Sequence, residues 1–320
     1  MSNAVTHPRA QHWQVPVIVS AVYLLGSALL VGFKVDQLFL AALFSTGWLV
    51  SGASRRWVMG FAVFMVYWVL FDWMKALPNY LVNPVHIGDL YAAELRWFGI
   101  GEGADRITPN MWFATRTAPL LDLLAGLFYL CWVPVPLAFA AYLFTKDADA
   151  FLRFALTFLT VNLVGFAVYY LYPAAPPWYV AQYGFDFDPT TPGNTAGLVR
   201  FDELIGVPLF TGMYGKSSNV FAAMPSLHAA YLITVVHAAW RKGLRRFAGI
   251  AAVLMVGIWW AAVYSGHHYV LDVLFQRLVR WPVLARAFAR YRAAIAPPAL
   301  GEVPPSPTNE RIHHSHVTHR

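Results

Sequence analysis

Two short motifs, Pro225-Ser226-Leu227-His228 and His268-Tyr269-Val270-Leu271-Asp272, stand at the edges of long apolar runs in this chain. Ionisable groups at a membrane boundary are costly to bury and are usually functional. The four-residue spacing of His268 and Asp272 places both side chains on one face of a helix, where the carboxylate can accept a proton from one imidazole nitrogen. The other nitrogen is then free to attack. We therefore predict that His268 is a nucleophile oriented by Asp272.

The first motif predicts the start of a helix that attracts an anion. Pro225 disfavours helix at Met224 and fits the first helical turn, while Ser226 can cap the free N–H groups. His228 then stands at a helix N-terminus, where a phosphate group is favoured. A protonated His228 can donate to a leaving oxygen as phosphorus passes to His268, and this chemistry requires neither a metal nor a cofactor.

The composition indicates an integral membrane protein. Of the 320 residues, 58% are hydrophobic and only 12% are charged, which exceeds what a soluble core of this length needs. The single cysteine, Cys131, excludes a disulfide framework and a thiolate metal site. The net charge of +7 does not indicate nucleic-acid binding, because the basic residues form short clusters beside apolar runs.

Apolar runs that approach or reach the length of a membrane span predict an all-α, polytopic membrane helix bundle. They lie at residues 15–33, 38–50, 57–73, 120–144, 151–172, 225–240, 247–264 and 270–281, of which the second and the last are short. We divide the chain into N-terminal anchor helices at 1–56, a catalytic membrane domain at 57–281 and a basic, disordered cytoplasmic tail at 282–320.

The distribution of lysine and arginine predicts the orientation of the bundle. Paired and clustered cations alternate with isolated ones along the predicted loops, and the clustered side is expected to be cytoplasmic. Both termini are then cytoplasmic and both motifs extracytoplasmic, as in a multi-pass protein of a bacterial inner membrane. Two long outer loops, 74–117 and 173–219, are long enough to shape a site, and residues 90–97 are expected to form an interfacial helix.

The two motifs resemble those of the type 2 phosphatidic acid phosphatase superfamily, Pro-Ser-x-His and His-x-x-x-Asp. Their neighbours, in Met224-Pro225-Ser226-Leu227-His228-Ala229 and His268-Tyr269-x-x-Asp272-Val273, are similar to the fungal inositol phosphorylceramide synthases and their bacterial relatives. This resemblance implies a six-helix core preceded by extra N-terminal helices. It also implies that His228, His268 and Asp272 form a catalytic triad.

The sequence departs from the phosphatase branch where that branch binds phosphate. A Ser-Arg pair before the second histidine is replaced by Ala261-Ala262, so the phosphate-binding cations must come from elsewhere. The cations best placed on the outer side are Lys75, Arg116 and Lys216, and Ser226 is a further candidate for contact with phosphate. The missing arginine favours the phosphotransferase branch over a simple phosphatase.

Three functions fit these observations. The favoured one is a lipid phosphotransferase that moves a phospho-headgroup, with phosphoinositol as a candidate, from a phospholipid to a hydroxyl acceptor through a phosphohistidine. In the second, a phosphatase acting on a lipid phosphate or a polyprenyl pyrophosphate, water takes the place of the acceptor. The third is a non-catalytic membrane protein that binds or transports lipid. All three predict lipid partners and no nucleic acid.

Overall fold

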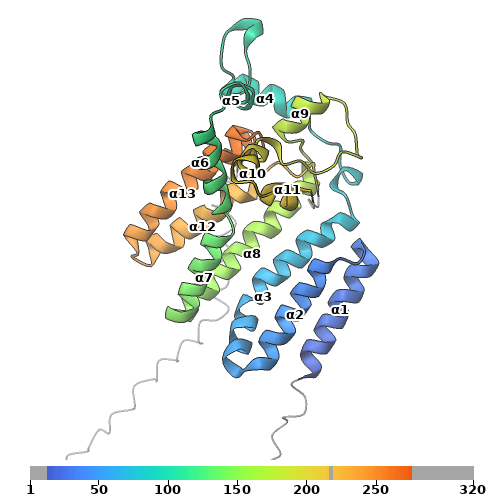
Figure 1. The fold of residues 1–320 in the computed structure, drawn as a ribbon, viewed down its shortest axis with the longest axis vertical. Helices are drawn as coiled ribbons and strands as arrows, with labels where there is room; N and C mark the ends of the chain where they lie inside the picture. Colours follow the sequence, from blue (N-terminus) through green and yellow to red (C-terminus); the bar gives the residue numbers. More distant parts are fainter. Residues whose placement is uncertain (1–12, 216–218, 276–320) are drawn as a thin grey trace, which may run out of the picture.

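Long helices make up most of the structure, a computed structural model that describes residues 13–215 and 219–275. Figure 1 shows these helices as a bundle covered at one end by short helices. Within the described residues, five helical segments are long and apolar enough to cross a membrane, and one shorter apolar helix, Val35–Val50, accompanies them. The predicted all-α, polytopic membrane bundle is confirmed.

The first three helices form an up-and-down group at one side of the bundle (Figure 1). They are α1 (Gln14–Val31), α2 (Val35–Val50) and α3 (Gly52–Trp73). The helix α3 begins five residues before the predicted span, because Ser51 caps it and accepts a hydrogen bond from the Ser54 N–H at 3.0 Å. The extra N-terminal helices that the sequence predicts are therefore α1 and α2.

The predicted span at 120–144 lies within one apolar segment long enough to cross a membrane, and the structure divides this segment into two helices. These are α6 (Pro119–Leu130) and α7 (Pro134–Lys146). Pro134 has no N–H to donate to a carbonyl one turn earlier, so the hydrogen-bond ladder of α6 cannot continue through it. Together the two helices still reach the length of one membrane span.

The remaining core helices are α8 (Ala148–Leu171), α12 (Leu227–Arg241) and α13 (Arg245–Tyr264), and residues 270–275 begin a further helical segment. Aromatic contacts attach α3 to α8, with ring centroids 5.1 Å apart for Phe64 and Phe158 and 5.9 Å apart for Tyr67 and Phe166. With α3 and the α6–α7 pair, these elements account for five helices of the predicted six-helix core and the first described residues of the sixth. The end of the last predicted span, beyond residue 275, and the predicted tail at 282–320 lie outside the described residues.

The two long loops fold into a cap over one end of the bundle (Figure 1). Its helices and 3₁₀ turns are η2 (Met74–Ala76), η3 (Asn79–Leu81), α4 (Gly88–Phe98), η4 (Gly103–Asp105), α5 (Pro109–Ala114), α9 (Pro177–Tyr183), η5 (Ala196–Leu198), α10 (Val199–Ile205) and α11 (Leu209–Tyr214). Backbone hydrogen bonds join the loops to each other and to the segment before α12. His86 donates to the Pro173 carbonyl at 2.8 Å, and Ala223 donates to the Ala174 carbonyl at 3.2 Å. The cap is thus fixed to the chain that leads into the first motif.

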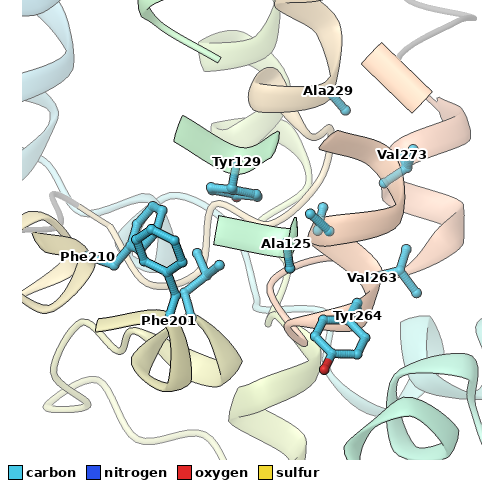
Figure 2. Packing of buried hydrophobic residues seen from close by; sticks show 11 residues of the cluster. Ala125, Tyr129, Phe201, Phe210, Ala229, Val263, Tyr264 and Val273 are labelled. Carbon is cyan, nitrogen blue, oxygen red and sulfur yellow. The ribbon is translucent and has the colours of Figure 1, made fainter. Parts of the chain in front are cut away.

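Buried side chains from the cap and the core meet beneath the short helices, as Figure 2 shows. Tyr129 of α6 faces Phe210 of α11, with ring centroids 6.0 Å apart, and Phe210 contacts Phe201 of α10 at 5.5 Å. Ala229 of α12 lies on the other side of Tyr129 in the same cluster. Burial of these large rings is what holds the cap on the bundle.

Candidate active site

The first motif forms the N-terminus of α12, as predicted. Ser226 is the capping residue: its side-chain oxygen accepts a hydrogen bond from the Ala229 N–H at 3.4 Å, and His228 follows in the first turn. The Ser226 N–H donates to the carbonyl of Asp272 at 3.3 Å. This backbone contact joins the two motifs directly, although more than forty residues separate them in sequence.

The second motif is arranged differently from the prediction. His268 lies in the turn before residues 270–275 and not on a helix, so the predicted shared helical face is wrong. Asp272 lies in the first helical turn, where its Oδ2 accepts the Tyr269 N–H at 2.8 Å and reaches to 3.6 Å from His268 Nδ1. That separation is an ion-pair distance, longer than a hydrogen bond. The pair is adjacent because the carboxylate folds back over the helix N-terminus, as in a capping box.

The structure brings the two predicted histidines together. The ring centroids of His228 and His268 are 5.8 Å apart. His228 Nδ1 lies 3.3 Å from the Tyr129 hydroxyl. The rings of His228 and Trp132 pack edge to face, with their centroids 4.5 Å apart. His268 is only 5% exposed and Asp272 is fully buried. Two imidazoles and a carboxylate therefore converge in a largely buried position under the cap.

Glu94 of α4 is a site residue that the sequence reasoning missed. Its carboxylate oxygens accept the Val270 N–H at 2.9 Å and the Leu271 N–H at 3.0 Å, and the side chain is fully buried. Burial raises the pKa of Glu94 to about 7, although the two backbone hydrogen bonds act in the opposite direction. Its position four residues after the buried Leu90 was the available signal, because it places a carboxylate on the inward face of α4.

Asn110 of α5 provides a second support for the same turn. Its amide nitrogen donates to the carbonyls of Val263 and His268 at 2.8 and 2.9 Å. The cap therefore holds the residues on both sides of the second motif: Asn110 fixes the chain at His268, and Glu94 fixes the helix start that carries Asp272.

Two of the predicted phosphate-binding cations, Lys75 and Arg116, have described contacts with groups other than the histidines. Lys75 lies at the end of α3 beside Lys34, whose ammonium pairs with Asp72 at 2.7 Å. The exposed Arg116 packs its guanidinium 4.4 Å from the ring of Trp112. Neither cation occurs among the described contacts of His228 and His268, and Lys216 lies outside the described residues. Ser226 is at the site, where its side-chain oxygen caps α12.

Between residues 13 and 275, gaps aside, no group of three or more His, Cys, Asp or Glu side chains is arranged to hold a metal ion. The acidic and imidazole groups of the site are instead arranged in pairs. Asp272 is paired with His268, and Glu94 is paired with two backbone N–H groups. The chemistry that this arrangement can perform is proton transfer and nucleophilic attack by imidazole.

Comparisons with known proteins agree with this geometry. The model of the PAP2 superfamily matches residues 102–275, a range that contains both motifs. The phosphoinositol dihydroceramide synthase of Bacteroides thetaiotaomicron is 44% identical over 260 residues, which cover 81% of this chain and 85% of that protein. No solved structure matches the chain significantly.

More distant relatives are fungal. The inositol phosphorylceramide synthase of Candida albicans is 34% identical over 165 residues, 50% of this chain and 35% of that protein. The catalytic subunit of the Saccharomyces cerevisiae enzyme is 33% identical over 166 residues, 50% of this chain and 41% of that protein. These similarities confirm the predicted class, a multi-pass membrane enzyme that is a lipid phosphotransferase. The chain belongs to the PAP2 superfamily.

Proposed function

We propose that this protein transfers phosphoinositol from an inositol phospholipid to the hydroxyl group of a ceramide-type lipid, with His228, His268 and Asp272 as its catalytic residues. The observation that carries the proposal is the convergence of these three side chains in a chain that matches a phosphoinositol dihydroceramide synthase over most of both proteins. Lipid substrates suit a site carried by a bundle of membrane-spanning helices with exposed apolar side chains.

The first half of the reaction forms a phosphohistidine. Asp272 lies beside Nδ1 of His268 and favours the tautomer whose lone pair is on Nε2. Nε2 attacks phosphorus, the nitrogen–phosphorus bond forms, and the bond from phosphorus to the diacylglycerol oxygen breaks. Protonated His228 donates its proton to that leaving oxygen, so diacylglycerol departs as a neutral alcohol.

The second half returns the enzyme to its starting state. The acceptor hydroxyl attacks phosphorus while His228, now neutral, takes the hydroxyl proton. The nitrogen–phosphorus bond breaks, and its electron pair returns to Nε2 of His268. The proton that His228 transfers in both steps is the one on Nε2, because Nδ1 is in contact with the Tyr129 hydroxyl at 3.3 Å.

Burial of the site supports transfer over hydrolysis. Water and a lipid alcohol compete for the same phosphohistidine, and the outcome depends on which of them reaches phosphorus. His268 is 5% exposed and lies beneath a cap whose loops are joined by backbone hydrogen bonds. Restricting water at this position favours the lipid acceptor.

The positions of basic residues near the helix turns support an orientation of the bundle in the membrane. The turns that join α2 to α3 and α12 to α13 lie at the end of the bundle away from the cap (Figure 1). The basic pairs Arg55-Arg56, in the first turns of α3, and Arg241-Lys242, at the end of α12, flank these turns. The positive-inside rule then assigns the cap to the extracytoplasmic side and both termini to the cytoplasm of a bacterial inner membrane. Residues 1–56 act as an anchor ahead of the catalytic domain at 57–281.

A transfer assay tests the function. Purified protein is incubated with phosphatidylinositol carrying a labelled phosphate, with and without ceramide. The expected result is a new labelled lipid that forms only with ceramide and that the His268→Ala variant does not form. Label released into water as inositol phosphate at the same rate with and without ceramide would instead make the protein a hydrolase. Unchanged substrate in both reactions would contradict catalysis.

A further inference from the structure

A third histidine, His267, lies beside the site and has no part in the mechanism above. It is 6% exposed, and its Nδ1 lies 3.0 Å from the side-chain oxygen of Ser265. Its ring centroid is 4.5 Å from that of Tyr214 and 5.6 Å from that of Tyr129. Because Tyr129 also contacts His228, the pair of His267 and Tyr214 adjoins the reacting groups.

The side-chain oxygen of Ser265 lies 3.0 Å from His267 Nδ1 and 3.5 Å from the Ala262 carbonyl oxygen, and the shorter contact fits either group as its donor. The Ser265 hydroxyl is taken here as the donor to Nδ1, which puts the ring proton of His267 on Nε2. Burial, together with the nearby His268 and His228, lowers the pKa of His267 well below its usual range, so the ring is neutral.

Two buried polar groups lack a hydrogen bond of ordinary geometry among the described residues: His267 Nε2 and the Tyr214 hydroxyl. The Tyr214 hydroxyl does interact with the neighbouring hydroxyl of Tyr129, which in turn contacts His228. Buried polar groups in folded proteins almost always have a hydrogen-bond partner. Two such groups that lack one beside a reaction centre therefore indicate a ligand that supplies the acceptor. An acceptor that can serve two neighbouring donors at once is an oxygen-rich group such as phosphate.

The same region is where the sequence lacks a cation. Ala261 and Ala262 stand where the phosphatase branch has its Ser-Arg pair, and both alanines are fully buried. They cannot bind an anion. The two neutral donors of His267 and Tyr214 are next to this position. His267 follows Ala262 by five residues, and its backbone N–H donates to the Ala262 carbonyl at 3.0 Å.

We propose, on the basis of the function above, that His267 Nε2 and the Tyr214 hydroxyl donate hydrogen bonds to the non-bridging phosphate oxygens of the phospholipid headgroup. The site thereby binds the phosphate with neutral donors in place of an arginine. Such donors stabilise the negative charge on phosphorus-bound oxygens, and burial strengthens each bond. They add no positive charge that would compete with protonation of His228.

The test uses orthovanadate, a phosphate mimic, as the probe. Its dissociation constant is measured from the protection of purified protein against thermal unfolding, which does not depend on turnover. Tyr214→Phe and His267→Asn should each weaken vanadate binding by roughly 10- to 100-fold, the range for one lost hydrogen bond to a charged oxygen. His267→Gln places an N–H near the Nε2 position, so it should lose less vanadate affinity than His267→Asn.

Matched variants and a second ligand make the result decisive. The exposed Tyr142 of α7 and the exposed His237 of α12 supply Tyr142→Phe and His237→Gln as controls that should bind vanadate normally. Vanadate binding equal to that of the wild type in Tyr214→Phe and His267→Asn, or none in the wild type, would overturn the proposal. If the variants instead weaken protection by free myo-inositol and leave vanadate unaffected, the donors contact the inositol ring and the phosphate assignment is wrong.

The transfer assay keeps this proposal separate from the proposed function. If the wild type binds vanadate but forms no labelled ceramide product, the proposed function is contradicted and the proposed phosphate site is not. If the wild type transfers phosphoinositol and the variants transfer it at the same rate, the proposed phosphate site is contradicted and the proposed function is not. The expected result for Tyr214→Phe is a kcat/KM for the phospholipid reduced by the same factor as its vanadate affinity.

Discussion

One carboxylate oxygen of Asp272 interacts with both the backbone of Tyr269 and the ring of His268. Oδ2 accepts the Tyr269 N–H and lies 3.6 Å from His268 Nδ1, while Oδ1 is buried without a hydrogen-bond partner among the described residues. The residue thus contributes to the helix start and, in the proposed mechanism, also to the tautomer of His268. Those two contributions can be separated experimentally, because an amide keeps an acceptor for the backbone but loses the negative charge.

Replacement of Asp272 by asparagine should therefore reduce catalysis more than folding. We expect kcat to fall by roughly 10²- to 10⁴-fold, since the imidazole loses the charge that stabilises its productive form. The KM for the phospholipid should change little. The exposed Asp149 of α8 supplies the control variant Asp149→Asn, which should be fully active. Steady-state transfer kinetics measure both, and near-normal kcat in Asp272→Asn would exclude the orienting role.

At the scale of elements, the decisive contact is between α4 and the segment that starts at residue 270. Glu94 supplies two acceptors to the first N–H groups of that segment, which have no acceptor within their own helix. A glutamine has one acceptor oxygen and one donor nitrogen, so one of the two buried N–H groups would lose its partner. That loss costs about 1–3 kcal/mol of folding free energy.

Glu94→Gln should consequently lower kcat roughly tenfold while leaving KM nearly unchanged, because a loosened helix start misplaces Asp272 and His268. We expect Glu94 to act as a positioning residue, because both of its carboxylate oxygens accept backbone N–H groups. The exposed Glu203 of α10 gives the matched control Glu203→Gln. Equal kcat values for Glu94→Gln and the wild type would show that α4 does not position the site.

The pH dependence of stability gives a second readout of Glu94. Its pKa in the folded protein is about 7, above the ordinary value of 4.5, so the folded protein binds this proton more tightly than the unfolded chain. The associated stability is complete below about pH 4.5 and is lost as pH rises through about 7. The melting temperature of the wild type should therefore fall relative to that of Glu94→Gln between about pH 5 and pH 8. A constant difference across this range would contradict the raised pKa.

Local signals in the sequence predicted some elements well and others not at all. The start of α12 depends on Pro225 and on Ser226, which caps an N–H three residues away, so the motif itself contained the information. Pro134 was also a readable signal, and the predicted span at 120–144 overlooked it. The spacing of Glu94 to Leu90 indicated an inward-facing carboxylate, but its partners were not readable, because Val270 is 176 residues distant and only the folded cap brings them together.

The proposed phosphate contacts illustrate the same limit of sequence-based prediction. Lys75, Arg116 and Lys216 were chosen because they are cations on the predicted outer side, a criterion that uses charge and loop position alone. The structure places Arg116 on the ring of Trp112 and Lys75 beside Lys34. Neutral donors such as Tyr214 carry no charge and occur throughout an aromatic-rich chain, so composition gives no reason to select one of them.

For the whole molecule, the orientation is testable with single cysteines in a Cys131→Ser background. Ala53, exposed in the first turn of α3, and Glu102, exposed in the cap, lie on opposite sides of one membrane span. A membrane-impermeant maleimide added to intact cells should label Glu102→Cys, whereas Ala53→Cys should react only after permeabilisation. Labelling of both positions in intact cells, or of Ala53→Cys alone, would contradict the proposed topology.

The long-range contacts of the second motif also determine when the enzyme becomes active during its synthesis. Asn110 is 158 residues from His268, and Glu94 is 176 residues from Val270. A ribosome delivers the chain from its N-terminus, so α4 and α5 are made long before the segment that they hold. The nascent chain therefore carries an incomplete site until nearly all of its described helices have been made. A protein that cleaves phospholipids thus acquires this ability only at the end of its own assembly.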